Sequence, residues 1–211
     1  MRIVFDLDGT LIDSAPDLQA ATNRMLADQG CASLDLATIT SFVGNGLPKL
    51  VERAMRASGL DMTEHPRLSA LTLEYYNQDP ATLSQLYPGL KALLTALKAA
   101  GHRLGVCTNK PFEPAVAILV EMGLEDHFDV VVGGDTLAVK KPDPQPLLHS
   151  LVKLGDGPAL YVGDSEVDAE TAARAGVDFA LFTEGYRKTP IEDLPHAFAF
   201  DHFDKLAAHL A

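Results

Sequence analysis

The second half of the chain alternates short apolar runs with stretches whose apolar residues recur every three or four positions. The short runs predict buried β-strands over residues 103–107, 130–132, 159–162 and 179–182. The stretches between them predict helices, marked by Leu90, Leu93, Leu94 and Leu97, by Val116, Leu119 and Val120, by Leu147, Leu148 and Leu151, and by residues 169–175. This alternation of strand and helix predicts a parallel, doubly wound sheet.

The first half begins with one more predicted strand and is then helical. Residues 2–5 form a short, β-prone run, whereas from Ala15 to Leu86 the apolar spacing is helical and no convincing strand is present. Ser14 and Pro16 are typical of the start of a helix, and Gly30 is typical of its end. The helical stretch is therefore expected to be an insertion after the first strand.

Together these elements predict an α/β fold, with a doubly wound, mainly parallel, Rossmann-like sheet and an inserted helical cap domain. The catalytic core is expected over residues 1–14 and 87–211, and the cap over residues 15–86. The turn-forming segment Tyr87-Pro88-Gly89 marks the return to the core. We expect the cap to lie over the ends of the strands.

Composition and charge limit the partners of the chain. Of its 211 residues, 17 are Lys or Arg and 29 are Asp or Glu, so the formal net charge is −12. This charge argues against nucleic acid and anionic membranes as partners. It would also repel an anionic substrate, so a site for such a substrate must be locally positive.

Cysteine usage and hydropathy indicate a cytoplasmic protein. Only Cys31 and Cys107 are present, which argues against a disulfide framework and fits a reduced cytosol. Cys107 lies in an apolar run and is expected in the core. No run is long enough to span a membrane, and Asp6 and Asp8 interrupt any signal-peptide core.

Two carboxylates follow the first strand directly. Asp6 and Asp8 stand one residue apart in Phe5-Asp6-Leu7-Asp8-Gly9-Thr10, where a strand gives way to a loop. Carboxylates this close repel each other unless a cation shares the space, which indicates a hard divalent metal. The pair also fits two roles, one as nucleophile and one as acid/base. The alternative is an ordinary polar turn.

Other strands also end on polar residues. Residues 103–107 are followed by Thr108-Asn109-Lys110, and residues 159–162 by Gly163-Asp164-Ser165. The carboxyl ends of parallel strands share one edge of a sheet, so these residues should converge with Asp6. The Pro-rich segment Lys140-Lys141-Pro142-Asp143-Pro144 adds a lysine on a rigid loop. Carboxylates, a hydroxyl, free amides and a lysine suit phosphoryl transfer.

Each of these residues also has a structural explanation. Thr108 can be a strand-end hydroxyl, Lys141 a solvated surface lysine and Asp164 a turn residue. Two residue pairs match the capping box at the start of a helix, namely Ser165 with Asp168 and Thr10 with Asp13.

The order of the four motifs resembles that of the haloacid dehalogenase-like superfamily. The motifs stand here as Asp6-Leu7-Asp8-Gly9-Thr10, Thr108-Asn109, Lys141-Pro142, and Gly163-Asp164-Ser165 with Asp168. The resemblance covers nearly the whole chain and includes the insertion point of a helical cap. Within the superfamily the chain is most similar to the phosphoglycolate phosphatases, on the evidence of Asp6 to Ser14 with Pro16-Asp17, Val43-Gly44-Asn45-Gly46, Tyr87-Pro88-Gly89, Lys141 to Pro144, Val162 to Ser165 and, more weakly, Phe200 to Phe203.

This resemblance implies a Mg²⁺-dependent phosphatase for a small phosphate monoester. Asp6 would attack phosphorus and form an aspartyl phosphate, and Asp8 would protonate the leaving alcohol and then activate water. Mg²⁺ would be bound by Asp6, the backbone carbonyl of Asp8 and Asp164, with Asp168 behind these ligands rather than among them.

The resemblance also implies how the phosphate is held. Thr108, the amide of Asn109 and Lys141 would contact it, with Lys141 preferred over Lys140 because it directly precedes the proline. Lys141 and the metal would supply the local positive charge that the net charge makes necessary.

The implied reaction is hydrolysis of phosphoglycolate to glycolate. Substrate binding is expected from the cap residues Gly44, Asn45, Gly46 and Arg53. Lys49, Arg53 and Arg56 share one face of the helix that follows, and Arg53 is the expected partner of the substrate's carboxylate. The alternative is that these basic side chains only face water.

Other functions remain open at this stage. Asp8 argues against the dehalogenases, which lack this Asp, and against the phosphonate-cleaving relatives, which need a cap lysine such as Lys49. The remaining alternatives are a sugar phosphomutase of the same superfamily, a phosphatase for a different small phosphorylated metabolite, and a binding module without turnover. The sequence does not specify an oligomeric state.

Overall fold

The computed structural model describes residues 1–78 and 81–210. Residues 79–80 and 211, inside the predicted ranges 15–86 and 87–211, lie outside the described residues. The chain divides into two compact units, Met1–Asp13 with Leu86–Ala211 and Ser14–Gln85. We describe each unit by itself, and the assignment of the second as a catalytic cap stays a prediction.

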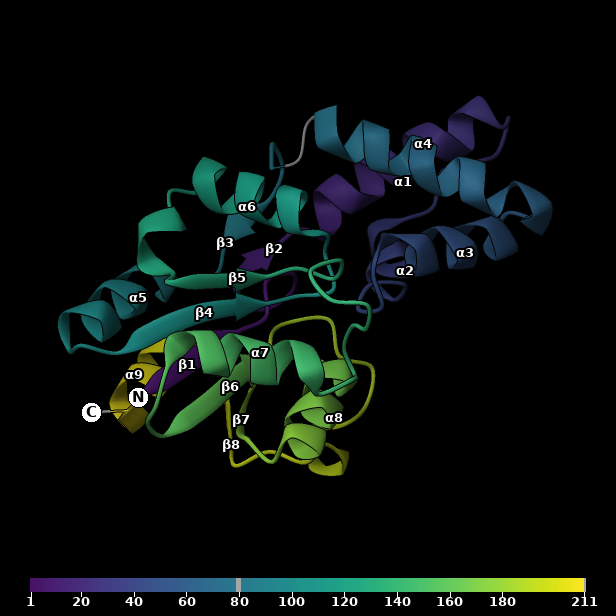
Figure 1. The fold of residues 1–211 in the computed structure, drawn as a ribbon. Coiled ribbons are helices and arrows are strands. Elements are labelled where there is room, and N and C mark those ends of the chain that lie inside the picture. Colours follow the sequence, from purple (N-terminus) through teal and green to yellow (C-terminus); the bar gives the residue numbers. More distant parts are fainter. Residues whose placement is uncertain (79–80, 211) are drawn as a thin grey trace. The chain divides into compact units, whose positions relative to one another are not determined.

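The first unit is built around a six-stranded sheet (Figure 1). All paired strands run parallel, in the order β5-β4-β1-β6-β7-β8. Their bounds are β1 Arg2–Phe5, β4 Arg103–Cys107, β5 Val130–Val132, β6 Ala159–Gly163, β7 Asp178–Phe182 and β8 Phe198–Phe200. The predicted parallel, doubly wound sheet is confirmed.

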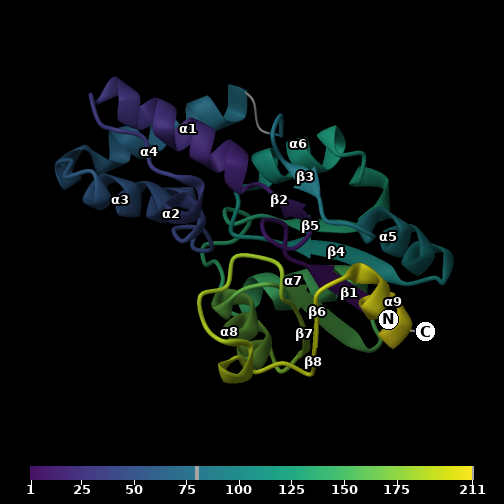
Figure 2. The same cartoon turned by 180° about the vertical axis from the view of Figure 1, so that it is seen from behind.

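Helices cover both faces of this sheet (Figures 1 and 2). Helices α5 (Leu90–Ala99), α6 (Phe112–Glu121) and α9 (Phe203–Leu210) lie on one face, and α7 (Gln145–Leu154) and α8 (Glu166–Ala175) lie on the other. Right-handed crossovers explain the division, because the chain steps outward from β1 to β5 and then returns past β1 to β7. The crossover helices therefore change from one face to the other where the direction of the chain across the sheet reverses.

The core of this unit follows from the apolar strands. Ile3, Val4 and Phe5 of the central strand β1 are fully buried, as expected for a strand covered on both faces. Cys107 lies in the same core as predicted, and burial raises the pKa of its thiol to about 12. Such a thiol is a packing group rather than a nucleophile.

The second unit is helical. It contains α1 (Ala15–Asp28), α2 (Leu36–Thr40), α3 (Leu47–Ala57) and α4 (His65–Gln78), packed around a core of Met25, Leu26, Val51, Met55 and Leu68. Pro16 stands in the first turn of α1 as predicted, although the side chain of Ser14 makes no capping hydrogen bond there. The buried Asp17 carboxylate accepts hydrogen bonds from the amides of Leu83 and Ser84, which closes the unit near its ends.

Several short elements were not predicted. Strands β2 (Ile12–Asp13) and β3 (Gln85–Leu86) pair as a two-stranded sheet, so the expectation of no strand between Ala15 and Leu86 was wrong at its last residues. The pattern of the sequence also did not predict α2, β8 and α9, nor the short 3₁₀ helices Met62–Glu64, Glu125–His127 and Ile191–Asp193. Apart from α9, which has eight residues, these elements are two to five residues long and too short to show a period.

Candidate active site

The ends of three adjacent strands meet at one point of the sheet edge. Phe5, the last residue of β1, pairs with Val106 of β4 and Val162 of β6. The amide of Asp6 continues the ladder by donating to the carbonyl of Val162 at 2.8 Å. In the sheet, β1 lies between β4 and β6, and the order of the strands along the chain reverses its direction at β1. Open α/β sheets bind ligands at such a reversal.

Lys141 lies where these strand ends meet. Its ammonium is 2.8 Å from Oδ1 of Asp6, 2.7 Å from Oδ1 of Asp168 and 2.8 Å from the hydroxyl of Tyr161. Only 2% of the lysine side chain is exposed. Burial alone would lower its pKa, but Asp168 and Asp6 outweigh burial and raise the pKa above its usual value. Lys141 is therefore a buried lysine whose charged form is favoured by two carboxylates, and the alternative of a solvated surface lysine is wrong.

Asp168 caps a helix and binds Lys141 at the same time. Its Oδ2 accepts from the amide of Ser165 at 3.1 Å and from the hydroxyl of Ser165 at 2.6 Å, and the capping box predicted for this pair is present. Burial would raise the pKa of Asp168, but the nearby Lys141 outweighs it, so that the pKa falls. Both oxygens have partners within the protein, which fits a supporting role better than direct binding of a metal.

Asp164 is held by groups from two loops. Its Oδ1 accepts from the hydroxyl of Thr10 at 2.8 Å, and its Oδ2 accepts from the amide of Tyr186 at 2.6 Å. The predicted capping box of Thr10 with Asp13 is wrong, because α1 begins at Ala15 and the Thr10 hydroxyl points to Asp164. The Asp13 carboxylate instead accepts from the hydroxyl of Tyr186 at 2.7 Å.

Two glycines allow the backbone to approach Asp164 closely. Gly9 has φ of 85°, and a Cβ added there would lie 2.5 Å from Oδ2 of Asp164. A Cβ at Gly185 would lie 2.3 Å from the Cβ of Asp164. Any side chain at either position would displace this carboxylate, which explains the glycine in the first motif.

The carboxylates of this edge fit a divalent cation. One oxygen each from Asp6, Asp164 and Asp168 lie within 4.8 Å of one another, and all three residues are buried. Burial, opposed by Lys141 and reinforced by the charge of Asp168, raises the pKa of Asp6 to about 7. Burial and then the charges of Asp168 and Asp6 also raise the pKa of Asp164. Such a crowded set stays ionised when a cation compensates it, and a hard oxygen-binding ion such as Mg²⁺ suits these donors.

Asp8 is paired with a lysine to which the sequence analysis gave no role. The Lys110 ammonium lies 2.8 Å from Oδ1 and 3.0 Å from Oδ2 of Asp8, and only 6% of the lysine side chain is exposed. The sequence signal for a role of Lys110 is its position, directly after Thr108-Asn109 at the end of a predicted strand. Nothing in the sequence shows that the side chain turns inward to Asp8.

The predicted phosphate-binding residues lie on two loops that are tied together. Thr108 is buried, and its hydroxyl accepts from the amide of Lys110 at 3.1 Å. The side-chain amide of Asn109 donates to the carbonyl of Lys141 at 3.0 Å. Lys141 is buried whereas Lys140 is exposed, so Lys141 is the one of the two that lies at the site.

In the helical unit, the predicted substrate-binding residues hold one another. Arg53 donates to the carbonyl of Phe42 at 2.6 Å and to Oδ1 of Asn45 at 2.8 Å. The guanidinium thus braces the loop that carries Gly44, Asn45 and Gly46. The other two basic residues predicted on this helix face, Lys49 and Arg56, both contact Glu52, at 2.6 and 3.1 Å.

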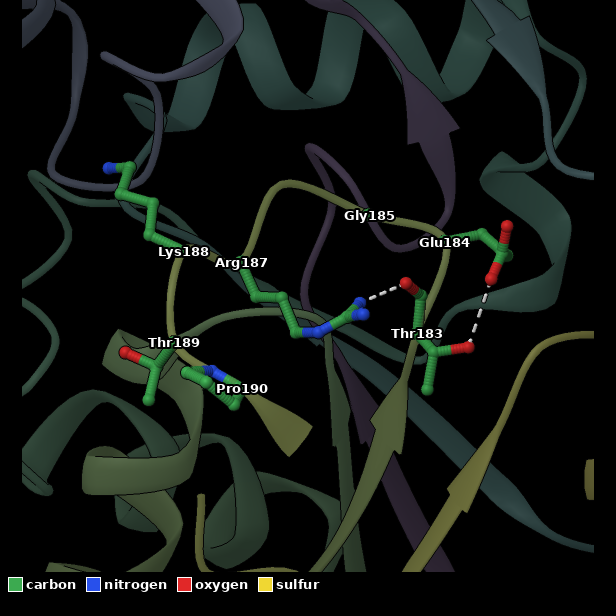
Figure 3. Close-up of a pocket in the computed structure, with 7 residues that line it drawn as sticks. All are labelled: Thr183, Glu184, Gly185, Arg187, Lys188, Thr189 and Pro190. Atoms are coloured by element: carbon green, nitrogen blue, oxygen red, sulfur yellow. Dashed lines mark hydrogen bonds between the residues drawn. The ribbon is translucent and has the colours of Figure 1, made fainter. Parts of the chain in front are cut away.

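A cavity of about 440 Å³ lies beside the loop after β7 (Figure 3). Within it, Arg187 donates to the carbonyl of Thr183, and the hydroxyl of Thr183 donates to Glu184 at 3.1 Å. The lining residues are Thr183, Glu184, Gly185, Arg187, Lys188, Thr189 and Pro190, and they include none of the clustered carboxylates.

Comparison with known proteins agrees with this geometry. The model of the haloacid dehalogenase-like hydrolase family matches residues 3–182. This chain belongs to that family. The predicted resemblance and the predicted class of enzyme, a hydrolase, are therefore confirmed.

Individual relatives of the haloacid dehalogenase-like hydrolase are similar over nearly their whole length. A Cereibacter sphaeroides protein named phosphoglycolate phosphatase is 50% identical over 206 residues, covering 97% of this chain and 94% of the relative. A protein of the same name from Rhodospirillum rubrum is 46% identical over 213 residues, covering 97% and 88%. The crystal structure of a predicted phosphoglycolate phosphatase from Haemophilus somnus 129pt has a TM-score of 0.93 at 33% identity, covering 99% and 97%.

The prediction on membrane spans can also be checked. Among the described residues of this haloacid dehalogenase-like hydrolase, no helix has both the length and the apolar character needed to cross a bilayer.

The Lys141 cluster predicts that Tyr161→Phe destabilises the protein. The Tyr161 hydroxyl contacts Lys141 and Asp168, each at 2.8 Å, inside the core. Its removal leaves a buried ammonium short of one acceptor, and we expect a loss of about 1–3 kcal/mol in the free energy of unfolding. Chemical denaturation measures this loss. In the control, Tyr75→Phe removes an exposed hydroxyl bonded to Asp28 and should change stability by less than about 0.5 kcal/mol. Equal effects of the two substitutions would contradict a buried, fully paired cluster.

Proposed function

We propose that this haloacid dehalogenase-like hydrolase is a Mg²⁺-dependent phosphatase that converts phosphoglycolate to glycolate and phosphate through an aspartyl phosphate on Asp6. One observation carries the proposal. Asp6 directly follows the central strand, and its carboxylate lies 2.8 Å from the buried ammonium of Lys141 and close to oxygens of Asp164 and Asp168. A nucleophilic carboxylate, a fixed cation and a divalent-metal site are the requirements of phosphoryl transfer.

In the first step, a carboxylate oxygen of Asp6 forms a bond to phosphorus while the bond from phosphorus to the ester oxygen breaks. Asp8 gives its proton to the departing glycolate oxygen. In the second step, Asp8 takes a proton from water, the water oxygen bonds to phosphorus, and the bond from phosphorus to Asp6 breaks. Phosphate leaves, and both carboxylates return to their starting states.

The groups around Asp6 support the charges of this reaction. Lys141, the amide of Asn109 and the hydroxyl of Thr108 are proposed to hold the transferring phosphate. Asp6, Asp164 and the backbone carbonyl of Asp8 are the proposed ligands of Mg²⁺. When bound, the metal supplies positive charge to the phosphate oxygens. Asp168 keeps Lys141 ionised and oriented rather than contacting the substrate.

The proposed substrate follows from the relatives named phosphoglycolate phosphatase and from the identity of up to 50% with them. The cap residues Gly44, Asn45 and Gly46 are proposed to contact the substrate, from a loop that Arg53 braces. The sugar phosphomutase alternative is not favoured, because the closely similar relatives carry the phosphatase name.

The proposed setting is the cytoplasm, with a small phosphorylated metabolite as partner. Cys31 and Cys107 are both free thiols, which supports a reducing compartment. The net charge of −12 supports the proposal that neither nucleic acid nor anionic membrane is a partner.

The proposed substrate can be tested by phosphate release from a panel of small monoesters. We expect kcat/KM for phosphoglycolate to exceed that for sugar phosphates and for p-nitrophenyl phosphate by about tenfold or more. Water alone should be the phosphate acceptor, without need for a sugar bisphosphate. A higher kcat/KM for another monoester would replace the proposed substrate, and a bisphosphate requirement would indicate a mutase.

Asp6→Asn should abolish turnover and leave the fold intact. Asparagine keeps the shape of the side chain but cannot form the acyl phosphate, so kcat should fall by about a thousandfold or more. Steady-state kinetics and circular dichroism measure the two properties. Asp178→Asn, which changes an exposed aspartate at the start of β7, is the matched control and should retain full activity. Retention of more than a few per cent of kcat by Asp6→Asn would exclude Asp6 as the nucleophile.

Activity should depend on Mg²⁺ and vanish in EDTA. We also expect Mg²⁺ to raise the melting temperature of the metal-free protein, because binding to the folded state stabilises it. Asp164→Asn should lose this shift in melting temperature. Ca²⁺ should inhibit, since its larger and looser coordination would misplace the reacting oxygens. Full activity after complete chelation would contradict the proposed site.

A further inference from the structure

The loop after β7 contacts Asp164 through a residue that has no role in the mechanism above. Tyr186 is buried, with 8% of the residue exposed, and its amide donates to Oδ2 of Asp164 at 2.6 Å. The hydroxyl of Tyr186 donates to Oδ1 of Asp13 at 2.7 Å. The same residue therefore holds a proposed metal ligand with its backbone and a different segment of the core unit with its side chain.

That other segment, residues 6–13, carries the remaining proposed ligands of Mg²⁺. The segment is hydrogen-bonded to itself, because the amide of Gly9 donates to the carbonyl of Ile12 at 2.8 Å. A hydrogen bond at Asp13 is therefore a hydrogen bond to the structure that presents the other ligands.

The packing between Tyr186 and this segment is tight. A Cβ added at Gly9 would lie 2.8 Å from Cδ2 of the Tyr186 ring, so the ring lies directly against the backbone of the segment. A Cβ added at Gly185 would lie 2.3 Å from the carbonyl oxygen of Gly9. The segment 6–13 thus sets the position from which the Tyr186 amide reaches Asp164.

Both oxygens of Asp164 are oriented by the segment 6–13. Oδ1 accepts directly from the hydroxyl of Thr10, which belongs to the segment, and Oδ2 accepts from Tyr186, which the segment holds in turn. Loops have more conformational freedom than the strands they join, so a loop amide orients a carboxylate only where the loop itself is held. Groups that hydrogen-bond to a metal ligand in this way orient it and strengthen metal binding.

We propose that Tyr186 is a positioning residue for Mg²⁺ binding, whose hydroxyl contact to Asp13 holds the backbone amide that orients Asp164. The inference rests on the proposed function, in which Asp164 is a ligand of the metal. Tyr186 acts through Asp164 and contacts neither the metal nor the substrate.

The test removes the hydroxyl and keeps the ring, with the variant Tyr186→Phe. Calorimetric titration of the metal-free protein with Mg²⁺ gives the Kd for the metal, and chemical denaturation without metal gives the stability. We expect this Kd to rise about tenfold, the low end of the loss when a group behind a metal ligand is removed. At saturating Mg²⁺, kcat and KM for phosphoglycolate should return to wild-type values, because the bound metal selects the productive position of Asp164.

A matched control separates this role from a purely structural one. Tyr76→Phe removes the hydroxyl of another buried tyrosine, on α4 of the helical unit, and should leave the Kd for Mg²⁺ unchanged. If Tyr186→Phe is less stable but binds Mg²⁺ with the wild-type Kd, the inference is overturned and the hydroxyl has a structural role alone. An equal rise of the Kd in both variants would overturn it as well.

Substitutions at Asp13 test the other end of the contact, and they keep the inference testable if Tyr186→Phe does not fold. Asp13→Ala should raise the Kd for Mg²⁺ about tenfold, and the double variant should raise it no further, because both changes remove the same hydrogen bond. Effects that multiply in the double variant would overturn the inference. Asp13→Asn keeps an acceptor oxygen and should bind Mg²⁺ more tightly than Asp13→Ala. Equal losses would overturn the inference too, since the charge of Asp13 would then be responsible.

Failure of the proposed function is recognised separately. The wild-type protein would then show no binding of Mg²⁺ in the titration and no release of phosphate from phosphoglycolate.

Discussion

The contact on which this structure depends is the buried ammonium of Lys141 between Asp6 and Asp168. The two carboxylates come from the ends of different elements, β1 and the first turn of α8, and they lie 2.8 and 2.7 Å from the same nitrogen. Removing one partner of such a buried pair typically costs about 3–5 kcal/mol, because the other charge is left uncompensated. The same ammonium that joins these elements also faces the proposed nucleophile, so stability and chemistry share one group.

Charge balance explains why this group is a lysine at that position. The chain carries a net charge of −12, and Asp6, Asp164 and Asp168 are crowded at one buried edge. A phosphate ester could not approach such an edge unless cations offset these charges. Lys141, which contacts Asp6, and Lys110, which contacts Asp8, supply two of these cations. The proposed Mg²⁺ adds the remaining positive charge, which links metal binding to substrate binding.

The sequence predicted the elements with a regular apolar pattern and the polar residues that follow the strands. Continuous apolar runs indicated β4, β6 and β7, and the polar residues after them indicated the shared edge, because parallel strands leave little freedom there. Contacts that depend on where a side chain turns could not be predicted. Lys110 turns inward to Asp8, Thr10 binds Asp164 rather than capping a helix, and Arg53 binds its neighbouring loop. Short elements such as β2 and β8 have no periodicity, because tertiary pairing alone forms them.

The central claim is that Asp6 carries the phosphoryl group between the two steps, and trapping that group tests it most directly. Substrate labelled in its phosphate is mixed with the enzyme and Mg²⁺ and quenched in acid within the first turnover, and the labelled peptide is then sequenced by mass spectrometry. The account predicts a hydroxylamine-sensitive label on the peptide that contains Asp6, at the side chain of that residue. Label on Asp8 or on any other residue would contradict it.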